Sequence, residues 1–351
     1  MLRRHPHAAV PLLLLAAGLL LVPACQKSPP SLNLLVWEGY ADPSFTQEFE
    51  QRTGSQVTAT YVASMDEFFA KIKAGGAGTY DLISPSCNAW KRFIDSDLVE
   101  AIDLDHVPNF KRLAPAFQEL EGNRKDGKVY GVTFTWGPCP ITYNADLIKE
   151  APASWAALFD RRHRGRIAVN DDPTTLYTVA LYMGFKDPYN LTEEELQLVK
   201  TKLLELKPQV RKFWSTAGEL ENLFANGEVD LALSWPLITN ALRRQGRNVA
   251  EVTPAEGATG WIDSWMIVKG TRHKELAEQW INYMLEPETQ KRLTRVTSYS
   301  PAVLETATLL TPEEAEGLHI NDPAYFDRLS FWGHVERLDR YTEIWNEVKA
   351  Q

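Results

Sequence analysis

The chain has 351 residues, 24% of them charged, and a formal net charge of −9 at neutral pH. Its length exceeds the roughly 250–300 residues at which a single hydrophobic core stops growing, so two domains are expected. The negative charge argues against nucleic acid and anionic membrane surfaces as partners, and it favours cationic ligands.

The first 24 residues are typical of a secretory signal. Two arginines precede an apolar run, residues 8–22, which is too short to span a membrane. The run ends in Leu-Val-Pro-Ala-Cys, which resembles the bacterial lipobox whose cysteine is acylated after cleavage. We therefore predict a periplasmic lipoprotein that begins at Cys25 and is lipidated there, with a net charge lowered from −9 to −11 by loss of the two arginines. Pro23 leaves ordinary signal cleavage at the same point open, and Gln26 leaves open which membrane holds the anchor.

Two further cysteines, Cys87 and Cys139, follow the signal. An exported protein folds in an oxidising compartment, so a disulfide between them is allowed, but two buried thiols explain them equally well. Three cysteines and scattered histidines match no zinc-binding pattern. No metal or other cofactor is therefore expected.

The first part of the mature chain predicts alternating strands and helices. Strands are expected at residues 32–37, 56–61 and 80–84. Asp42 with Pro43 begins the first helix, and Ser64 with Glu67 forms a capping box at the second. The glycine-rich residues 75–78 are expected to end that second helix, because no Gly-Lys-Ser or Gly-Lys-Thr follows them to form a phosphate-binding loop. This order predicts a parallel sheet covered by helices, an α/β fold.

The pattern restarts after a long extended stretch at residues 129–143. Strands are then expected at residues 166–170, 210–214 and 229–235, with helices at 154–160, after Pro173, from Thr192 to about 206, and at 220–224. A strand at residues 260–268 is followed by helices at 275–284, 287–297 and 337–349. One lobe thus begins, a second is inserted and the chain returns, with crossings near residues 136–141 and 259–264. Such crossings form a hinge with a cleft between the lobes, where ligands usually bind.

The strand at residues 260–268 carries a carboxylate between two indoles. Because alternate residues of a strand point to the same side, Trp261, Asp263 and Trp265 are expected to share one face. Indoles offer cation–π surfaces and a carboxylate offers a charged hydrogen bond, so this face suits an organic cation. The alternative is a core strand whose aspartate pairs with a buried arginine.

Aromatic residues and carboxylates recur where strands are expected to end, and in open α/β sheets ligands bind beyond the carboxyl ends of the strands. The segments in question are Leu-Val-Trp-Glu-Gly-Tyr at 35–40, Tyr-Asp-Leu-Ile-Ser-Pro-Ser at 80–86, Asn-Asp-Asp at 170–172, Leu-Ala-Leu-Ser-Trp at 231–235, Trp-Ile-Asp-Ser at 261–264 and Ser-Tyr-Ser-Pro at 298–301. Together they resemble the polyamine (spermidine/putrescine) periplasmic substrate-binding proteins of bacterial ABC importers. The resemblance extends from Leu32 to the C-terminal helix.

The resemblance implies a two-lobed periplasmic-binding-protein fold (type II). Residues 32–137 with 262–307 would form one lobe, and residues 138–261 with 308–351 the other. It also implies that the protein is a monomer which captures a small organic cation, a polyamine or diamine, between its lobes. The cation would be delivered to an ABC permease in the inner membrane.

The same resemblance implies a role for each candidate ligand-binding residue. Aromatic walls for the methylene chain would come from Trp37, Tyr40, Trp235 and Trp261. Hydrogen bonds would come from Ser86 and Tyr299, and the ammonium groups would be bound by Asp172 and Asp263. The structural alternatives are core packing for Trp37 and Trp235, a helix N-cap for Asp172 and a surface position for Tyr299.

Several positions depart from the family pattern. Gly39 stands where the family has an acidic residue, with Glu38 one position earlier, and Asn88 stands where an aromatic residue is common. Thr175 stands where spermidine binders have a second carboxylate, and Gly333 replaces a polar side chain. A third ammonium group would then face the neutral hydroxyl of Thr175, so a diamine is expected to bind better than spermidine. The alternative is that Glu38 reaches the third ammonium group.

Two other classes of function are weighed against transport. An enzyme would need a nucleophile with a base or a spaced pair of carboxylates, and the histidines after the signal lie in no such motif, so no enzyme activity is expected. A periplasmic ligand sensor that docks on a membrane signalling receptor would have the same two lobes. That sensor is the alternative to an importer component.

Overall fold

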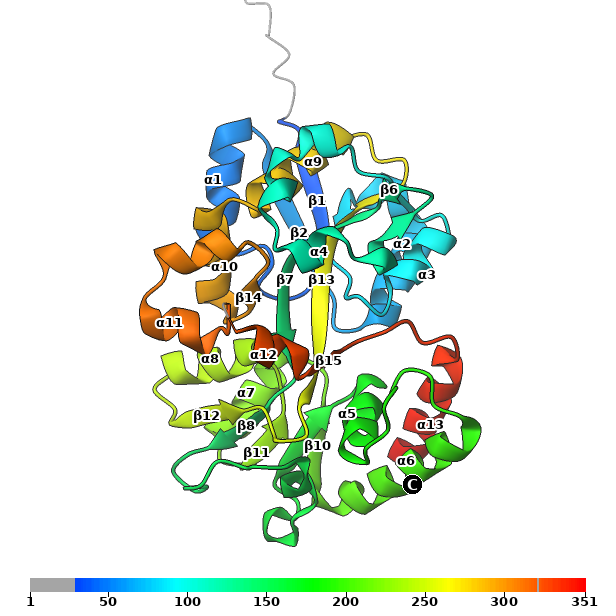
Figure 1. Cartoon of the computed structure of the whole chain (residues 1–351), viewed down its shortest axis with the longest axis vertical. Helices are drawn as coiled ribbons and strands as arrows, with labels where there is room; N and C mark the ends of the chain where they lie inside the picture. The colour runs from blue at the N-terminus through cyan, green and yellow to red at the C-terminus, as the bar shows by residue number, and fades with distance from the viewer. Residues whose placement is uncertain (1–28, 321) are drawn as a thin grey trace, which may run out of the picture.

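Two β-sheets organise the computed structural model, which describes residues 29–320 and 322–351 (Figure 1). The first sheet has the order β14-β7-β13-β3-β1-β2, and β4 and β15 pair with β13. Its strands are β1 (Ser31–Val36), β2 (Gln56–Tyr61), β3 (Leu82–Ile83), β4 (Val99–Glu100), β7 (Gly131–Pro138), β13 (Ala258–Val268), β14 (Ser300–Pro301) and β15 (Leu329–Phe331). The predicted signal and Cys25 lie outside the described residues.

The N-terminal part of this sheet is parallel, as predicted, because β1 pairs in parallel with both β2 and β3. Its helices are α1 (Pro43–Thr53), α2 (Met65–Thr79) and α3 (Trp90–Asp95). The Asp42 and Ser64 side chains cap α1 and α2, as their positions predicted. The glycine-rich stretch kinks α2 at Gly76 instead of ending it, and the helix continues to Thr79.

The second sheet has the order β10-β9-β11-β8-β12. Its strands are β8 (Ile141–Asn144), β9 (Ile167–Asn170), β10 (Val210–Trp214), β11 (Leu231–Leu233) and β12 (Val249–Val252), and its helices are α5 (Thr174–Tyr182), α6 (Glu193–Leu206), α7 (Ala217–Ala225) and α8 (Pro236–Arg244). The helix expected at residues 154–160 is a 3₁₀ helix, Trp155–Phe159. Sequence reasoning missed α8, which begins where the chain leaves the short strand β11.

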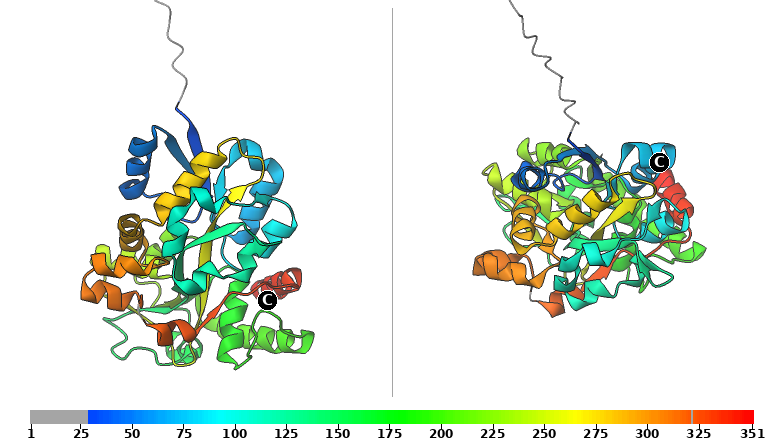
Figure 2. Two further views of the ribbon diagram at one scale, coloured as in Figure 1. Left: turned by 45° about the horizontal axis from the view of Figure 1, so that its top comes forward. Right: turned by 90° about the horizontal axis from the view of Figure 1, so that it is seen from above.

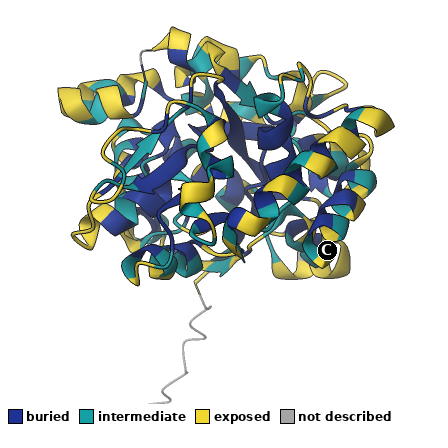
Figure 3. Cartoon of the chain, turned by 90° about the horizontal axis from the view of Figure 1, so that it is seen from below, coloured by how far each residue is buried: buried dark blue, intermediate teal, exposed yellow. Residues whose placement is uncertain are grey.

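Three segments connect the two sheets. The chain passes from β7 into β8 and returns from β12 into β13, and β7 pairs antiparallel with residues 260–266 of β13. It crosses again from β14 through α11 (Pro312–Gly317) and α12 (Pro323–Asp327) to α13 (Leu338–Ala350). Figure 1 shows β7 and β13 running from one half of the molecule toward the other. Both strands are buried throughout, and Figure 3 shows the buried residues gathered in the interior of the molecule.

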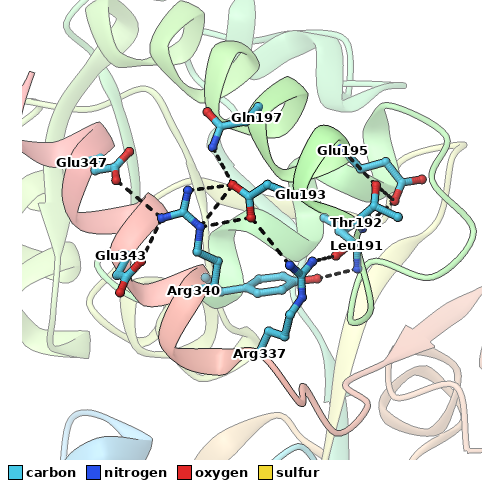
Figure 4. Close-up of polar contacts among 10 residues, drawn as sticks. Leu191, Thr192, Glu193, Glu195, Gln197, Arg337, Arg340, Glu343 and Glu347 are labelled. Atoms are coloured by element: carbon cyan, nitrogen blue, oxygen red, sulfur yellow. Dashed lines mark hydrogen bonds and ion pairs between the residues drawn. The ribbon is translucent and has the colours of Figure 1, made fainter.

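The C-terminal helix α13 packs against α6 at the edge of the second sheet (Figure 2). Glu193, at the first turn of α6, accepts a 2.7 Å hydrogen bond from Arg340 Nη2, and Arg337 donates to the Leu191 carbonyl (Figure 4). Thr192 and Glu195 form the predicted capping box. These ion pairs are exposed and each contributes little energy, so they orient α13 more than they stabilise the fold.

The other α-helices are α4 (Pro115–Gln118), α9 (Lys274–Met284) and α10 (Pro287–Thr297). The strands β5 (Arg124–Lys125) and β6 (Lys128–Val129) pair with each other in a separate two-stranded sheet. Over the described ranges, none of the helices combines the length and apolar character needed to cross a membrane. Those same ranges contain no group of three or more metal-ligating side chains.

Candidate functional site

A cavity of about 860 Å³ lies between the two sheets and is lined by residues of both. All of the predicted ligand-binding residues except Thr175 line it: Trp37, Glu38, Tyr40, Ser86, Asp172, Trp235, Trp261, Asp263 and Tyr299. Most of them stand one to four residues after a strand or within β13, so the ends of strands from both sheets converge on one space.

Asp263 lies on β13 with only 2% of its surface exposed. The Tyr40 hydroxyl donates a 2.5 Å hydrogen bond to Asp263 Oδ2, while Oδ1 has no partner within the described part of the chain. Burial raises the pKa of the Asp263 carboxyl to about 7, and the nearby hydroxyls of Ser86 and Tyr40 oppose that rise, although only Tyr40 is within hydrogen-bonding geometry. No arginine or lysine among the described residues pairs with it, so the alternative of a core aspartate–arginine pair is wrong.

Trp261 and Tyr299 form an aromatic corner beside Asp263. Their rings meet edge to face with centroids 4.4 Å apart, and Tyr299 is buried at 5% exposure instead of lying on the surface. Trp265 does not reach the cavity, because its ring is fully buried between Phe134 and Trp280. Of the predicted Trp-Asp-Trp face, only the first two residues line the cavity.

Two half-buried indoles form facing parts of the wall. Trp37, which follows β1, packs edge to face on Phe68 at 4.8 Å, and Trp235, which precedes α8, packs on Trp214 at 4.7 Å. Each ring therefore packs against its own lobe and also lines the cavity. Core packing and a place in the cavity wall, the two interpretations of Trp37 and Trp235, are therefore compatible.

The adjacent carboxylates Asp171 and Asp172 have different partners. Asp171 accepts hydrogen bonds from Trp345 Nε1 at 2.9 Å and Lys349 Nζ at 2.6 Å, so it holds α13 in place. Asp172 lines the cavity and accepts a 2.9 Å hydrogen bond from the Thr174 backbone N–H at the start of α5. Desolvation raises the pKa of the Asp172 carboxyl. Its role at the helix start leaves its charge available to a ligand.

Thr175 was expected to face the ligand, but it does not line the cavity. It is 1% exposed, and its hydroxyl donates a 2.8 Å hydrogen bond to the Asn170 carbonyl. Thr174 lines the cavity in its place, because one residue along a helix turns the side chain by about 100°. Asn88 and Gly333 do not line the cavity either; a methyl group at Gly333 would lie 3.0 Å from the Tyr189 ring, so packing explains that glycine.

Sequence reasoning missed several polar residues of the cavity, chiefly Glu221 on α7 and Arg244 and Gln245 at the end of α8. Residue Pro236 directly after Trp235 is a typical helix start and was the available signal for α8. Cys87 and Cys139 are free thiols, so no disulfide joins them. Burial raises the pKa of each thiol to about 12.

The sequence is similar to those of known bacterial binding proteins. The family described as bacterial extracellular solute-binding protein matches residues 44–323. The spermidine/putrescine-binding periplasmic protein of Escherichia coli is 28% identical over 308 residues, 86% of this chain and 87% of that protein. A putrescine-binding periplasmic protein of the same organism is 26% identical over 342 residues, 91% of each chain.

The fold is similar to that of solved binding proteins. The spermidine/putrescine ABC transporter substrate-binding protein of Streptococcus pneumoniae superposes with a TM-score of 0.77 at 22% identity, covering 92% of this chain and 99% of that one. This likeness confirms the two-lobed periplasmic-binding-protein fold of type II that the sequence predicted.

Proposed function

Because the chain belongs to the bacterial extracellular solute-binding proteins, we propose that it captures a small organic cation, a polyamine or diamine, between its lobes. The observation that carries the proposal is the Asp263 oxygen that has no hydrogen-bond partner among the described residues, on a buried carboxylate in the same cavity wall as the indole of Trp261. A buried charge without a counterion is costly, and an ammonium group would neutralise it. The names of the relatives agree with this ligand class.

The proposed contacts follow the chemistry of the cavity wall. Asp263 binds one ammonium group and Asp172 is available to another, since both carboxylates line the cavity. Aromatic faces along the walls suit a methylene chain with charged ends. The hydroxyls of Ser86 and Tyr299, which also line the cavity, would accept hydrogen bonds from the amine. Thr175 is left out of these contacts because its hydroxyl is bonded to Asn170.

We assign the protein to the periplasm, where it delivers the cation unchanged to an ABC permease of the inner membrane. The relatives in E. coli are periplasmic binding proteins, which supports this place. The similar protein of S. pneumoniae is the substrate-binding protein of an ABC transporter, which supports this partner over the receptor-docking sensor. We also propose that the protein is lipidated at Cys25 and that it is a monomer.

Calorimetric titration with a panel of amines tests the proposal. A charge-assisted hydrogen bond contributes about 1.5–3 kcal/mol, so Asp263→Asn is expected to weaken amine binding at least about tenfold. The exposed Asp339→Asn is the matched control, and it should leave the affinity unchanged. A wild-type protein that binds no amine, or an Asp263→Asn variant that binds as tightly as the wild type, would refute the assignment.

A further inference from the structure

A small side pocket of about 10 Å³ adjoins the ligand cavity. Four residues line both spaces: Asn170, Thr174, Trp235 and Trp332. A volume of this order holds about one water molecule or one oxygen atom of a ligand, and it is too small for an alkyl chain. The side pocket is therefore a place where a small substituent of a ligand in the cavity would fit.

Hydroxyl groups form part of the wall of the side pocket. Thr178 and Thr259 are 2% and 1% exposed, and their hydroxyl oxygens lie 3.2 Å apart. Only one of the two hydroxyls donates in that hydrogen bond, so the pair keeps a second hydrogen for another acceptor. The hydroxyl-bearing Ser234 lines the same pocket. Such a wall suits an oxygen atom better than a methyl group.

Trp332 brings an indole N–H group to the wall that the two spaces share. It follows β15 in the third crossing between the lobes and is 9% exposed. Its ring packs edge to face on Tyr177, with centroids 6.4 Å apart, and its buried Nε1 has no hydrogen-bond partner within the part of the chain that the structure describes. A buried N–H without an acceptor is costly. An ammonium group carries donors only, so an unsubstituted polyamine cannot satisfy this indole.

We infer that the ligand is an amine that also carries a neutral oxygen acceptor, a hydroxyl or an amide carbonyl, and that the side pocket binds this oxygen through Trp332 Nε1. The ammonium group of the same ligand remains with Asp263. The ligand class is therefore a hydroxylated or N-acylated diamine. This inference rests on the proposed function, because it takes an amine bound at Asp263 as its premise.

The competing explanation is that an ordered water molecule in the side pocket accepts from Trp332 and that the ligand is an unsubstituted polyamine. The indole nitrogens of Trp265 and Trp280 are also buried without a partner among the described residues, and neither ring lines the cavity. The fold therefore tolerates such donors. The two explanations differ in one respect: only a ligand oxygen makes the N–H of Trp332 matter for the choice between amines.

Calorimetric titration with two pairs of amines tests the inference. The pairs are 1,4-diamino-2-butanol with 1,4-diaminobutane, and N-acetyl-1,4-diaminobutane with butylamine, so both members of a pair carry the same number of ammonium groups. In at least one pair, the wild type is expected to bind the oxygen-bearing amine about fivefold more tightly, as expected for one neutral hydrogen bond. Trp332→Phe keeps an aromatic ring and removes the N–H, so it should abolish that preference.

Two further variants make the result specific. Trp280→Phe removes an equally buried indole N–H away from the cavity, and it should leave the affinity ratio of each pair as in the wild type. Thr178→Val replaces a hydroxyl of the side-pocket wall by a methyl group, and it should lower the same ratio as Trp332→Phe. It serves as the test if Trp332→Phe does not fold, which its melting temperature will show.

The outcomes separate the inference from the proposed function. If the wild type prefers neither oxygen-bearing amine, or if the preference survives in Trp332→Phe and Thr178→Val, the inference is wrong. The proposed function then still stands, provided that Asp263→Asn weakens the binding of 1,4-diaminobutane. If the wild type binds none of the four amines, the proposed function itself fails and the inference fails with it.

Discussion

Deep burial and the lack of a charged partner rarely occur together in one carboxylate, but Asp263 combines them. It is 2% exposed, yet its partners within the described part of the chain are neutral: the Tyr40 hydroxyl at 2.5 Å and, in a β-bridge, the backbone of Ser86. Burial raises the pKa of the Asp263 carboxyl to about 7 for this reason. In the ligand-free protein the group is therefore close to half protonated at neutral pH, and binding an ammonium group must displace that proton.

This shift predicts that amine affinity depends on pH. Below pH ~7 the Asp263 carboxyl is neutral and cannot pair with an ammonium group, whereas above it the carboxylate is charged. Alkylamines resemble lysine, whose reference pKa is about 10.4, so the ligand stays charged throughout. The affinity for 1,4-diaminobutane should therefore fall about tenfold per unit below pH ~7 and level off above it. Calorimetry from pH 5 to 8.5 measures this, and Asp263→Asn should show a much flatter profile; a flat wild-type profile would contradict the prediction.

Most cavity positions were predictable because they follow strands in the sequence. Trp37, Asp172 and Trp235 stand at predicted strand ends, and two-residue periodicity places Trp261 and Asp263 together. The errors came from tertiary packing. Helix α9 brings Trp280 against Trp265, and Thr175 turns inward on α5; neither is encoded in local spacing. Glu221 reaches the cavity only because the second sheet orients α7 toward the first.

At the scale of elements, the pairing of β7 with β13 supports the binding wall. Gly137 on β7 stands opposite Trp261 on β13, and a methyl group added there would lie 2.7 Å from Trp261 Cζ2. The indole also packs edge to face on Tyr299, with ring centroids 4.4 Å apart. The absence of a side chain at this position therefore sets the place of the ring.

Gly137→Ala should accordingly push the Trp261 ring toward the cavity. We expect amine affinity to fall about fivefold, in the range of a lost cation–π contact, and the melting temperature to drop because the site is overpacked. Gly218→Ala on α7, where an added methyl group meets nothing within 4 Å, is the matched control. The measurement is calorimetry with thermal unfolding, and unchanged affinity in Gly137→Ala would show that the ring position is unimportant.

Helix starts were the easiest features to predict from the sequence, because a capping side chain is a local signal. Asp42, Ser64 and Thr192 all cap helices as their spacing predicted. Helix α8 was missed because its apolar residues directly follow a buried strand and read as a continuation of it. The order of strands and helices was enough to predict an inserted second lobe, but the contact of α8 with the first lobe was not predictable.

At the scale of the whole molecule, α8 and α10 meet across the opening of the cavity. Asn240 Nδ2 on α8 donates long hydrogen bonds to the carbonyls of Arg295 and Val296 on α10, at 3.3 and 3.4 Å, and Arg244 Nη2 donates to Val296 at 3.5 Å. Asp263 and Trp261, which line the same cavity, are almost fully buried. A ligand must therefore part the lobes to reach Asp263, and these bonds favour the closed arrangement.

Asn240 does not line the cavity, so its removal tests closure apart from ligand contact. Losing its bonds should cost about 1 kcal/mol of the closed state, which lowers apparent affinity up to about fivefold through the smaller closed population. Asn240→Ala should weaken every amine by the same factor, because the closed state is shared by all ligands. Calorimetry with mono-, di- and triamines measures this, with the exposed Asn222→Ala on α7 as the control. A loss confined to one ligand length would mean that Asn240 acts on the ligand and not on closure.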